Sequence, residues 1–240
     1  MLVKTKGIVL HVTKYGDSQQ IVDMITPSYG RVSFIVTLSR SPKAKIKPQY
    51  FQLLSILNIE FDYRAKLQLH RLKDVSIAVP LTSIPSSIYK ICISTFIAEF
   101  LYYSTRNEVE NEQLFQFLIY SILWLDKVKQ KFANFHIVFM LRMSLFLGFF
   151  PNMENSQFRF FDLETGCFSS VAPIHLHYLN EADSRMMRIL LRLKYDTMHL
   201  FQMSRAERNK CVHLILLYYR LHLPNFPELK SVAVLNDLYS

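Results

Sequence analysis

The periodicity of the hydrophobic residues changes once along this 240-residue chain, and that change limits the fold more than any motif does. In residues 1–80 apolar side chains recur at every second position, most clearly between residues 53 and 62, which is typical of half-buried β-strands. After Pro80 and Pro85 the apolar residues recur with a helical period. We therefore expect an α+β protein that begins with strands and ends with helices.

Five strands are expected before that change, and none is separated from the next by a long helix. A five-stranded OB-fold β-barrel suits this pattern, although a five-stranded SH3-like barrel would give the same count. The predicted barrel domain covers residues 1–80. Its strands are expected at residues 6–12, 20–26, 31–38, 53–62 and 66–73.

An α-helical domain is expected over residues 81–240, with an irregular insert at residues 152–179 that holds one hairpin around Gly166. Asn107 with Glu110, and Ser204 with Glu207, have the spacing of helix N-caps, and Asn180 is a further cap. The helices are expected at residues 87–105, 107–131, 133–149, 180–194, 204–222 and 229–239.

Positive charge is concentrated in the predicted barrel. Of the net charge of +9, residues 1–80 contribute +7, from 12 Lys and Arg against 5 Asp and Glu. A small unit with this excess attracts polyanions, because its phosphate contacts release condensed counterions. A basic face kept only for solubility is the alternative, and the clustering argues against it.

The strongest local signal is a basic segment between Pro42 and Pro48, preceded by Arg40. Five further cations come from the turns and strands around it. We predict that together they bind a nucleic acid: Lys14, Arg31, Arg40, Lys43, Lys45, Lys47, Arg64, Lys66 and Arg71. Nearby aromatic residues such as Tyr15 and Tyr50 could stack on bases, although core packing is the commoner use of an aromatic side chain.

Catalytic and cofactor motifs are not found in the sequence. No glycine-rich phosphate loop occurs, so no nucleotide cofactor is expected. The pairs His175-x-His177 and Cys211-x-His213 are interpreted as surface or core residues, and no metal site is expected. Asp23 and Glu60 would serve a metal-dependent nuclease, but a charge on an exposed face is the commoner reading. We expect a non-enzymatic protein.

The sequence also indicates where the protein works. The apolar stretches are shorter than the roughly 20 residues that a membrane span needs, and the first residues lack the apolar core of a signal peptide. Three scattered cysteines do not form a disulfide framework. A cytoplasmic protein without membrane contact is expected.

Several segments resemble, in their order along the chain, the RecO family of bacterial recombination mediators. They are Lys6-Gly7-Ile8-Val9-Leu10, the run from Ile25 to Val32, and Tyr218-Tyr219-Arg220-Leu221-His222-Leu223-Pro224. The resemblance implies an N-terminal OB-fold and a helical C-terminal domain. It also implies binding to single- and double-stranded DNA, strand annealing, and partnership with RecR and single-stranded DNA-binding protein in loading RecA.

The sequence departs from that family in two places. Many relatives carry four cysteines in the insert, whereas this insert holds only Cys167, which excludes a four-cysteine zinc site. Apolar packing of the hairpin is expected instead. The usual Lys-Gly before the basic segment is Thr37-Leu38 here. Relatives bind the acidic, apolar tail of single-stranded DNA-binding protein in the helical domain, and Arg142 is our candidate contact.

RNA binding remains an open alternative to DNA binding. Contacts to the 2′-hydroxyl cannot be recognised from residue types alone.

Overall fold

The computed structural model describes residues 1–38 and 46–237. Its contacts divide the chain into two compact units, which are described separately. The first comprises Met1–Lys127 with Leu229–Leu238, and the second is formed by Val128–Glu228.

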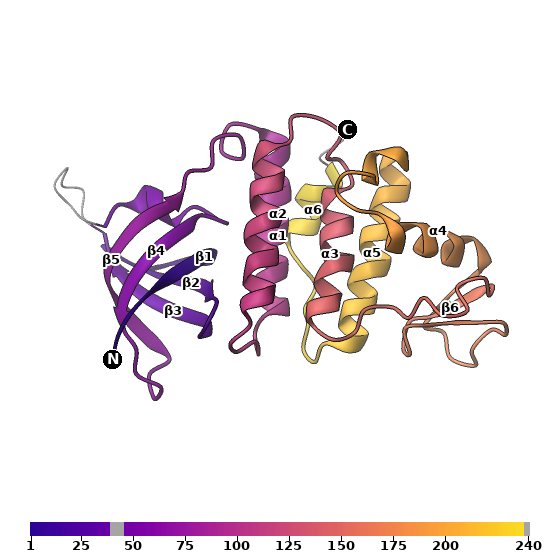
Figure 1. Ribbon diagram of the computed structural model, residues 1–240, viewed down its shortest axis with the longest axis horizontal. Coiled ribbons are helices and arrows are strands. Elements are labelled where there is room, and N and C mark those ends of the chain that lie inside the picture. The colour runs from indigo at the N-terminus through magenta and orange to yellow at the C-terminus, as the bar shows by residue number, and fades with distance from the viewer. Residues whose placement is uncertain (39–45, 238–240) are drawn as a thin grey trace. The chain divides into compact units, whose positions relative to one another are not determined.

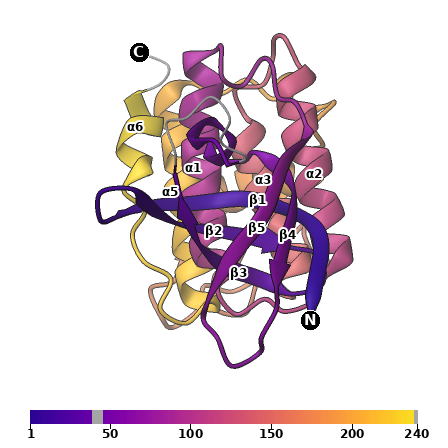
Figure 2. The same ribbon diagram turned by 90° about the vertical axis from the view of Figure 1, so that its left-hand side faces the viewer.

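Five strands close into a barrel at the start of the first unit (Figures 1 and 2). The strand order is β1-β2-β3-β5-β4, β3 and β5 are parallel, and the other neighbours are antiparallel. This order is the Greek-key barrel of an OB-fold, so the predicted fold class is confirmed. The strands are β1 (Leu2–Tyr15), β2 (Gln19–Thr26), β3 (Gly30–Thr37), β4 (Ile56–Asp62) and β5 (Leu69–Val79), with a 3-10 turn η1 (Pro48–Phe51) before β4.

Alternation of side chains fills the barrel. In β3, Val32, Phe34 and Val36 are buried, while the residues between them are partly exposed. Phe34 meets Phe61 of β4 edge to face, with ring centroids 4.9 Å apart. Because a slip of one residue would turn every inward side chain outward, this aromatic contact helps to fix the register of the strands.

Three helices complete the first unit, namely α1 (Ile88–Ser104), α2 (Glu112–Lys127) and α6 (Ser231–Asp237). The carboxylate of Glu99 in α1 accepts the backbone N–H groups of Lys230 and Ser231 at 3.0 and 2.8 Å. A side chain of α1 therefore caps the start of α6, a segment far away in sequence.

Asp126 near the end of α2 fixes the segment that connects the barrel to α1. Its carboxylate accepts the backbone N–H groups of Thr82, Ser83 and Ile84 at 3.1, 2.8 and 2.8 Å. Beneath it, the ammonium group of Lys90, which is 2% exposed, donates to the Ser83 hydroxyl and to the Asp126 carbonyl. Burial alone would oppose ionisation of Asp126, but the three amides and Lys90 outweigh it and lower the carboxyl pKa.

The turn between β2 and β3 contacts the loop between α1 and α2. Gly30 has a φ of +58°, and a Cβ atom added there would lie 2.0 Å from the Glu108 carbonyl oxygen. The Asn111 N–H donates to the Pro27 carbonyl at 3.0 Å in the same region. Only glycine permits this close approach of two backbones.

The second unit contains α3 (Phe135–Phe146), α4 (Glu181–Arg192), the 3-10 turn η2 (Met198–Leu200) and α5 (Arg205–His222). A small sheet precedes α4, in the order β7 (Cys167–Ser169), β6 (Phe160–Asp162) and β8 (Tyr178–Leu179). Buried Asn134 donates to the carbonyls of Met198 and Phe201, and accepts from the Nε of Arg208 at 3.2 Å. This amide joins the start of α3 to α5.

The caps at Asn180 and at Ser204 with Glu207 are confirmed, as is the hairpin around Gly166. The predicted cap at Asn107 is wrong. The helix begins at Glu112, and the side chain of Asn111 accepts the Leu114 N–H at 3.0 Å. The loop needs these residues for its contact with the barrel turn, so the helix starts later than the sequence pattern suggests. Within the described residues, no helix has both the length and the apolar character to cross a bilayer.

Removal of the Asp126 carboxylate should lower the free energy of unfolding. Asp126→Ala leaves the Lys90 ammonium buried and three amides without their acceptor, so we expect a loss of about 3–5 kcal/mol. Urea unfolding followed by the fluorescence of Trp124, the single tryptophan, measures it. Asp62→Ala, which removes an exposed partner of Lys73, is the control and should have a much smaller effect. Equal effects would contradict the assigned role of Asp126.

Two glycine substitutions distinguish the destabilisation caused by a steric clash from that caused by a positive φ. Gly30→Ala should destabilise the protein by about 2–5 kcal/mol, because it adds a steric clash to a positive φ. Gly16 has a φ of +66° but nothing within 4 Å of an added Cβ, so Gly16→Ala should cost only about 1–2 kcal/mol. Thermal unfolding of both variants tests this, and equal losses would show that the contact with Glu108 is unimportant.

Candidate nucleic-acid interface

The outward side of β1, β2, β3 and β5 carries two cross-strand rows beside the β1–β2 turn. One row joins Tyr15, Gln19 and Thr37, and the next pairs Thr13 with Ile21, Ile35 and Arg71. Arg71 is exposed on this side, and the ring of Tyr15 is 53% exposed. Lys14 is in the row of Gln20 and buried Val36, so its side chain leaves the opposite side of β1 and is exposed at the end of the barrel. The outer face and the adjoining barrel end therefore combine cations with an accessible aromatic ring, the residue types that bind phosphate and stack on unpaired bases.

The strand that precedes the basic segment ends next to this face. The Leu38 N–H donates to the Ser18 carbonyl at 2.8 Å, which places the end of β3 against the β1–β2 turn. Arg40, Lys43 and Lys45 lie outside the described residues. Lys47 is half-buried where the chain enters η1.

Arg64 and Lys66 lie at the other end of the strands. Both are exposed in the connection between β4 and β5. In that connection Tyr63 packs on Tyr29 of the β2–β3 turn, with ring centroids 4.5 Å apart. Because successive antiparallel strands turn at opposite ends, this turn lies opposite the β1–β2 turn. The predicted cations are thus distributed along the outer face, with Arg71 between its ends.

Arg31 and Lys73 each contact another residue of the first unit. The guanidinium of Arg31 donates to the Tyr102 carbonyl at 2.6 Å and lies 4.7 Å from the centre of the Tyr102 ring. The ammonium of Lys73 is 2.7 Å from the Asp62 carboxylate. Arg31 helps to hold β3 against α1, so we leave it out of the interface proposed below.

The two carboxylates considered for a nuclease have other partners. Asp23 is 7% exposed, accepts a hydrogen bond from the Ser33 hydroxyl and lies 3.4 Å from a nitrogen of His11. Glu60 is paired with Lys4 at 3.2 Å. Within residues 1–38 and 46–237, no group of three or more His, Cys, Asp or Glu side chains could hold a metal ion. Nothing in this arrangement supports nuclease chemistry.

A cleft of about 640 Å³ in the first unit lies between α1 and the ends of the barrel strands. Its described lining includes Tyr50, Ile77, Ile84 and Ile91 but no Lys, Arg, Asp or Glu. A phosphate group would lose its hydration there without gaining a cationic partner, so the cleft is not part of the charged interface.

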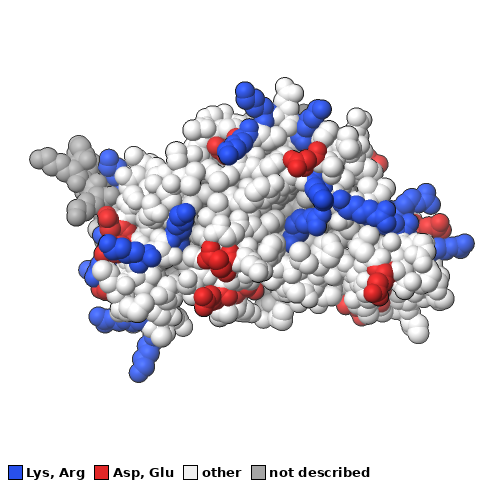
Figure 3. Space-filling model, in the orientation of Figure 1, with Lys and Arg blue, Asp and Glu red and all other residues white. Residues whose placement is uncertain are grey.

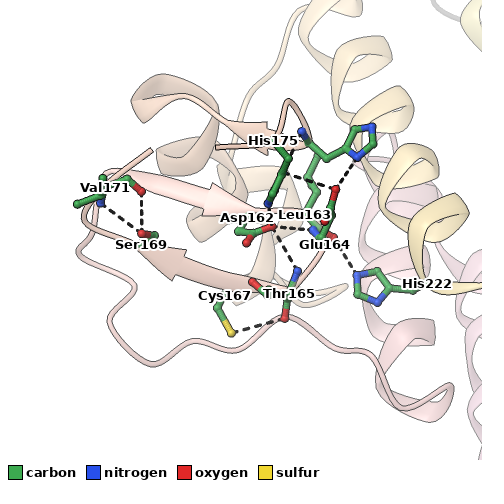
Figure 4. A network of polar contacts seen from close by, with 10 residues as sticks. Asp162, Leu163, Glu164, Thr165, Cys167, Ser169, Val171, His175 and His222 are labelled. Atoms are coloured by element: carbon green, nitrogen blue, oxygen red, sulfur yellow. Dashed lines mark hydrogen bonds and ion pairs between the residues drawn. The ribbon is translucent and has the colours of Figure 1, made fainter. Parts of the chain in front are cut away.

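The insert of the second unit is held by both apolar and polar contacts. Phe161 and Phe168 are buried against each other, with ring centroids 4.9 Å apart, so the expected apolar packing of the hairpin is confirmed. Figure 4 shows a polar network beside them, in which His175 lies 3.4 Å from the Asp162 carboxylate and 3.6 Å from that of Glu164. His177 is 2.8 Å from Glu164. Imidazole–carboxylate contacts thus connect the segment before β8 to the end of β6 and the turn that follows it.

Asp162 is the centre of that network. Its carboxylate accepts the backbone N–H groups of Glu164 and Thr165 at 2.8 and 3.3 Å and so closes the hairpin turn. Burial opposes its ionisation, but the contacts with Glu164, Thr165 and His175 prevail and lower the carboxyl pKa. The available sequence signal for this network was the pair His175-x-His177, whose carboxylate partners Asp162 and Glu164 lie on the far side of the hairpin in sequence.

Arg142, the predicted partner-binding residue, lies on α3. It is half-buried, and its guanidinium donates to the Leu193 carbonyl at 3.1 Å. Sequence reasoning missed a second group of cations on α4, formed by Arg185, Arg188 and Arg192. Their spacing of three and four residues was the available signal.

A closed five-stranded Greek-key barrel followed by helices defines an OB-fold barrel protein with a helical part. Comparisons with known proteins identify its family. The family profile described as "Recombination protein O N terminal" matches residues 1–80, and "Recombination protein O C terminal" matches residues 85–232. The chain belongs to the RecO family of DNA repair proteins.

Relatives named DNA repair protein RecO cover the whole chain. Those from Bacteroides fragilis and Phocaeicola vulgatus are 48% and 47% identical over 241 residues, with 100% of each chain covered. One from Flavobacterium psychrophilum is 36% identical over 242 residues, also with 100% of each chain covered.

The lowered pKa of Asp162 predicts a pH dependence. A carboxyl group whose pKa is lower in the folded state than in the unfolded state stabilises the folded state at pH values above its unfolded pKa of about 3.9. This stabilisation is lost as the pH falls through the folded-state pKa. Asp162→Asn should therefore reduce Tm at neutral pH, and the difference from the wild type should shrink toward pH ~3. Glu154→Gln, an exposed carboxyl in the same unit, is the control. A pH-independent difference for Asp162→Asn would contradict the prediction.

Proposed function

We propose that this protein binds single- and double-stranded DNA, anneals complementary strands, and helps to load RecA on strands coated with single-stranded DNA-binding protein. It acts in the cytoplasm and catalyses no covalent step. Membership of the RecO family supports the repair role. The observation that carries the DNA-binding part is that Arg71 and Tyr15 lie on the outer face of the barrel, with Lys14 exposed at the adjoining barrel end.

Charge is the physical basis of this binding. Lys14 and Arg71 are exposed, and no described residue forms an ion pair with either, so both charges are available to phosphate. Arg64 and Lys66 extend the interface along the barrel, and Arg40, Lys43, Lys45 and Lys47 are proposed to contribute to binding, the first three lying outside the described residues. Neutralising the phosphates of two strands reduces their repulsion and allows the bases to pair.

The helical part of the chain is proposed to recruit protein partners. RecR and single-stranded DNA-binding protein are the candidates, and an acidic tail of the latter would meet Arg142. The guanidinium of Arg142 donates through Nη2 to Leu193, which holds the side chain in place while other donors of the group stay available.

The DNA-binding proposal is tested by changing Arg71 of the outer face and Lys14 at the adjoining end of the barrel. Lys14→Glu with Arg71→Glu should lower affinity for a single-stranded oligonucleotide about tenfold. It should also reduce the slope of log affinity against log salt by about 1.4, from 0.7 per lost phosphate contact. Fluorescence anisotropy at several salt concentrations measures both quantities.

Lys4→Glu with Lys6→Glu is the matched control, because it makes the same change of charge on the β1–β4 side of the barrel. This variant should keep the wild-type slope. If the two double variants behave alike, binding depends on net charge and the outer face is not the interface. A matched RNA competitor of equal or higher affinity would favour an RNA-binding function.

A further inference from the structure

Helix α4 of the second unit presents a stripe of arginines. At about 100° per residue, positions 185, 188 and 192 fall within roughly 60° of one another around the helix. The buried residues of α4, Ser184, Met187, Leu190 and Leu191, lie on a different side. The stripe is about 10 Å long at 1.5 Å per residue. Three guanidinium groups therefore follow one line on the helix surface.

Contacts within the second unit hold this stripe in place, and further cations lie at both of its ends. The guanidinium of Arg188 donates to the Phe158 carbonyl at 2.9 Å and lies 5.5 Å from the Phe168 ring, which fixes α4 on the insert. The exposed side chain of Arg159 follows directly after Phe158. At the other end, the bond from Arg142 to the Leu193 carbonyl brings a cation of α3 close to Arg192 and Lys194.

Most of these charges are not neutralised. Arg159, Arg192 and Lys194 are exposed, and none has a side-chain ion pair or hydrogen bond with another described residue. Arg185 has only an exposed contact with Glu181 at 3.5 Å, one turn away. Figure 3 shows Lys and Arg gathered in a run over the area where Figure 1 labels α4, with acidic residues mainly at its edges.

We propose that this α4 surface, defined as Arg159, Arg185, Arg192 and Lys194 around the structurally engaged Arg188, binds the sugar-phosphate chain of a second DNA strand. The inference rests on the proposed function and adds a site that is separate from the barrel. Arginine suits this ligand, since its planar fork matches phosphate oxygens. A row of charges along a helix fits a ligand whose charge repeats along its length.

An acidic peptide is the other polyanion that such a surface could attract. A peptide with an apolar end needs an apolar pocket beside the cations. On α4 itself the exposed large apolar side chain is Ile189, which is 37% exposed. The exposed apolar residues of the insert, Val171, Ile174 and Leu176, lie in the connection between β7 and β8 and not on the helix. The observations therefore favour a phosphate chain, and peptide binding becomes an outcome of the test.

Two DNA sites on one chain have a direct consequence for annealing. Strands held on separate cationic surfaces are brought to a high effective concentration while their charge is partly neutralised. Removing the second site should leave binding of the first strand intact but slow the pairing of two strands.

The test uses the full-length protein and three double variants. The α4 variant is Arg192→Glu with Lys194→Glu. Its matched control is Lys129→Glu with Lys131→Glu, which changes two exposed cations of the second unit at the same spacing. The barrel variant is Lys14→Glu with Arg71→Glu. Each is titrated with a short labelled oligothymidine at low salt, assayed for annealing of complementary strands, and titrated with a labelled acidic peptide that has an apolar end.

We expect two oligonucleotides per chain for the wild type and the control, and one for the α4 variant. Annealing by the α4 variant should slow about tenfold, while affinity for the first oligonucleotide changes less than twofold. Two bound oligonucleotides and a wild-type annealing rate for the α4 variant would overturn the inference. So would loss of peptide binding with normal annealing, which would assign the surface to a peptide.

The two proposals fail in different ways. A wild-type protein that binds no oligonucleotide would refute the proposed function itself. A wild-type protein that anneals but binds one oligonucleotide, with only the barrel variant defective, would refute the α4 site alone.

Discussion

The first unit depends on one buried carboxylate. Asp126 accepts three successive backbone N–H groups of the segment that follows the barrel, and the ammonium of Lys90 lies beside it with almost no exposure to water. A buried charge is tolerated only when it is paired and hydrogen-bonded, so this geometry has few alternatives. By fixing the segment between β5 and α1, it sets how α1 continues from the barrel. The contacts of Arg31 with Tyr102 and of Gly30 with Glu108 follow from that placement.

The barrel cations differ in whether they have a partner within the fold. Arg31 donates to the Tyr102 carbonyl and Lys73 pairs with the Asp62 carboxylate, whereas Lys14, Arg64, Lys66 and Arg71 are exposed to solvent. Arg71 lies on the outer face that also carries Tyr15, Lys14 is at the adjoining end of the barrel, and Arg64 and Lys66 are in the connection between β4 and β5. An extended row of this kind suits a flexible polyanion better than a compact ligand, because each contact adds an independent release of counterions.

The second unit shows how a small insert can be stable without a four-cysteine metal site. The buried pair Phe161 and Phe168 supplies apolar contact, and the carboxylate of Asp162 closes the turn and meets His175. Arg188 then joins α4 to this insert through Phe158 and Phe168. The same contacts that stabilise the insert hold the arginine stripe of α4 in a fixed position, and the proposed second DNA site depends on that position.

The sequence by itself determined the barrel strands, the change to helices after Pro80, and the caps at Asn180 and Ser204. It also determined the excess of positive charge in the first eighty residues. Each of these features depends on neighbours along the chain. It could not show that Arg31 is bonded within the fold while Arg71 is exposed, because the partner of Arg31, Tyr102, is distant in sequence. It also could not place the cap at Asn111, because the loop there is held by a bond to the Pro27 carbonyl of the backbone. The rows of the outer face needed the strand register, in which Arg71 lies beside Ile35. Local periodicity fixes which elements form, whereas long-range contacts decide which of their charges remain available to a partner.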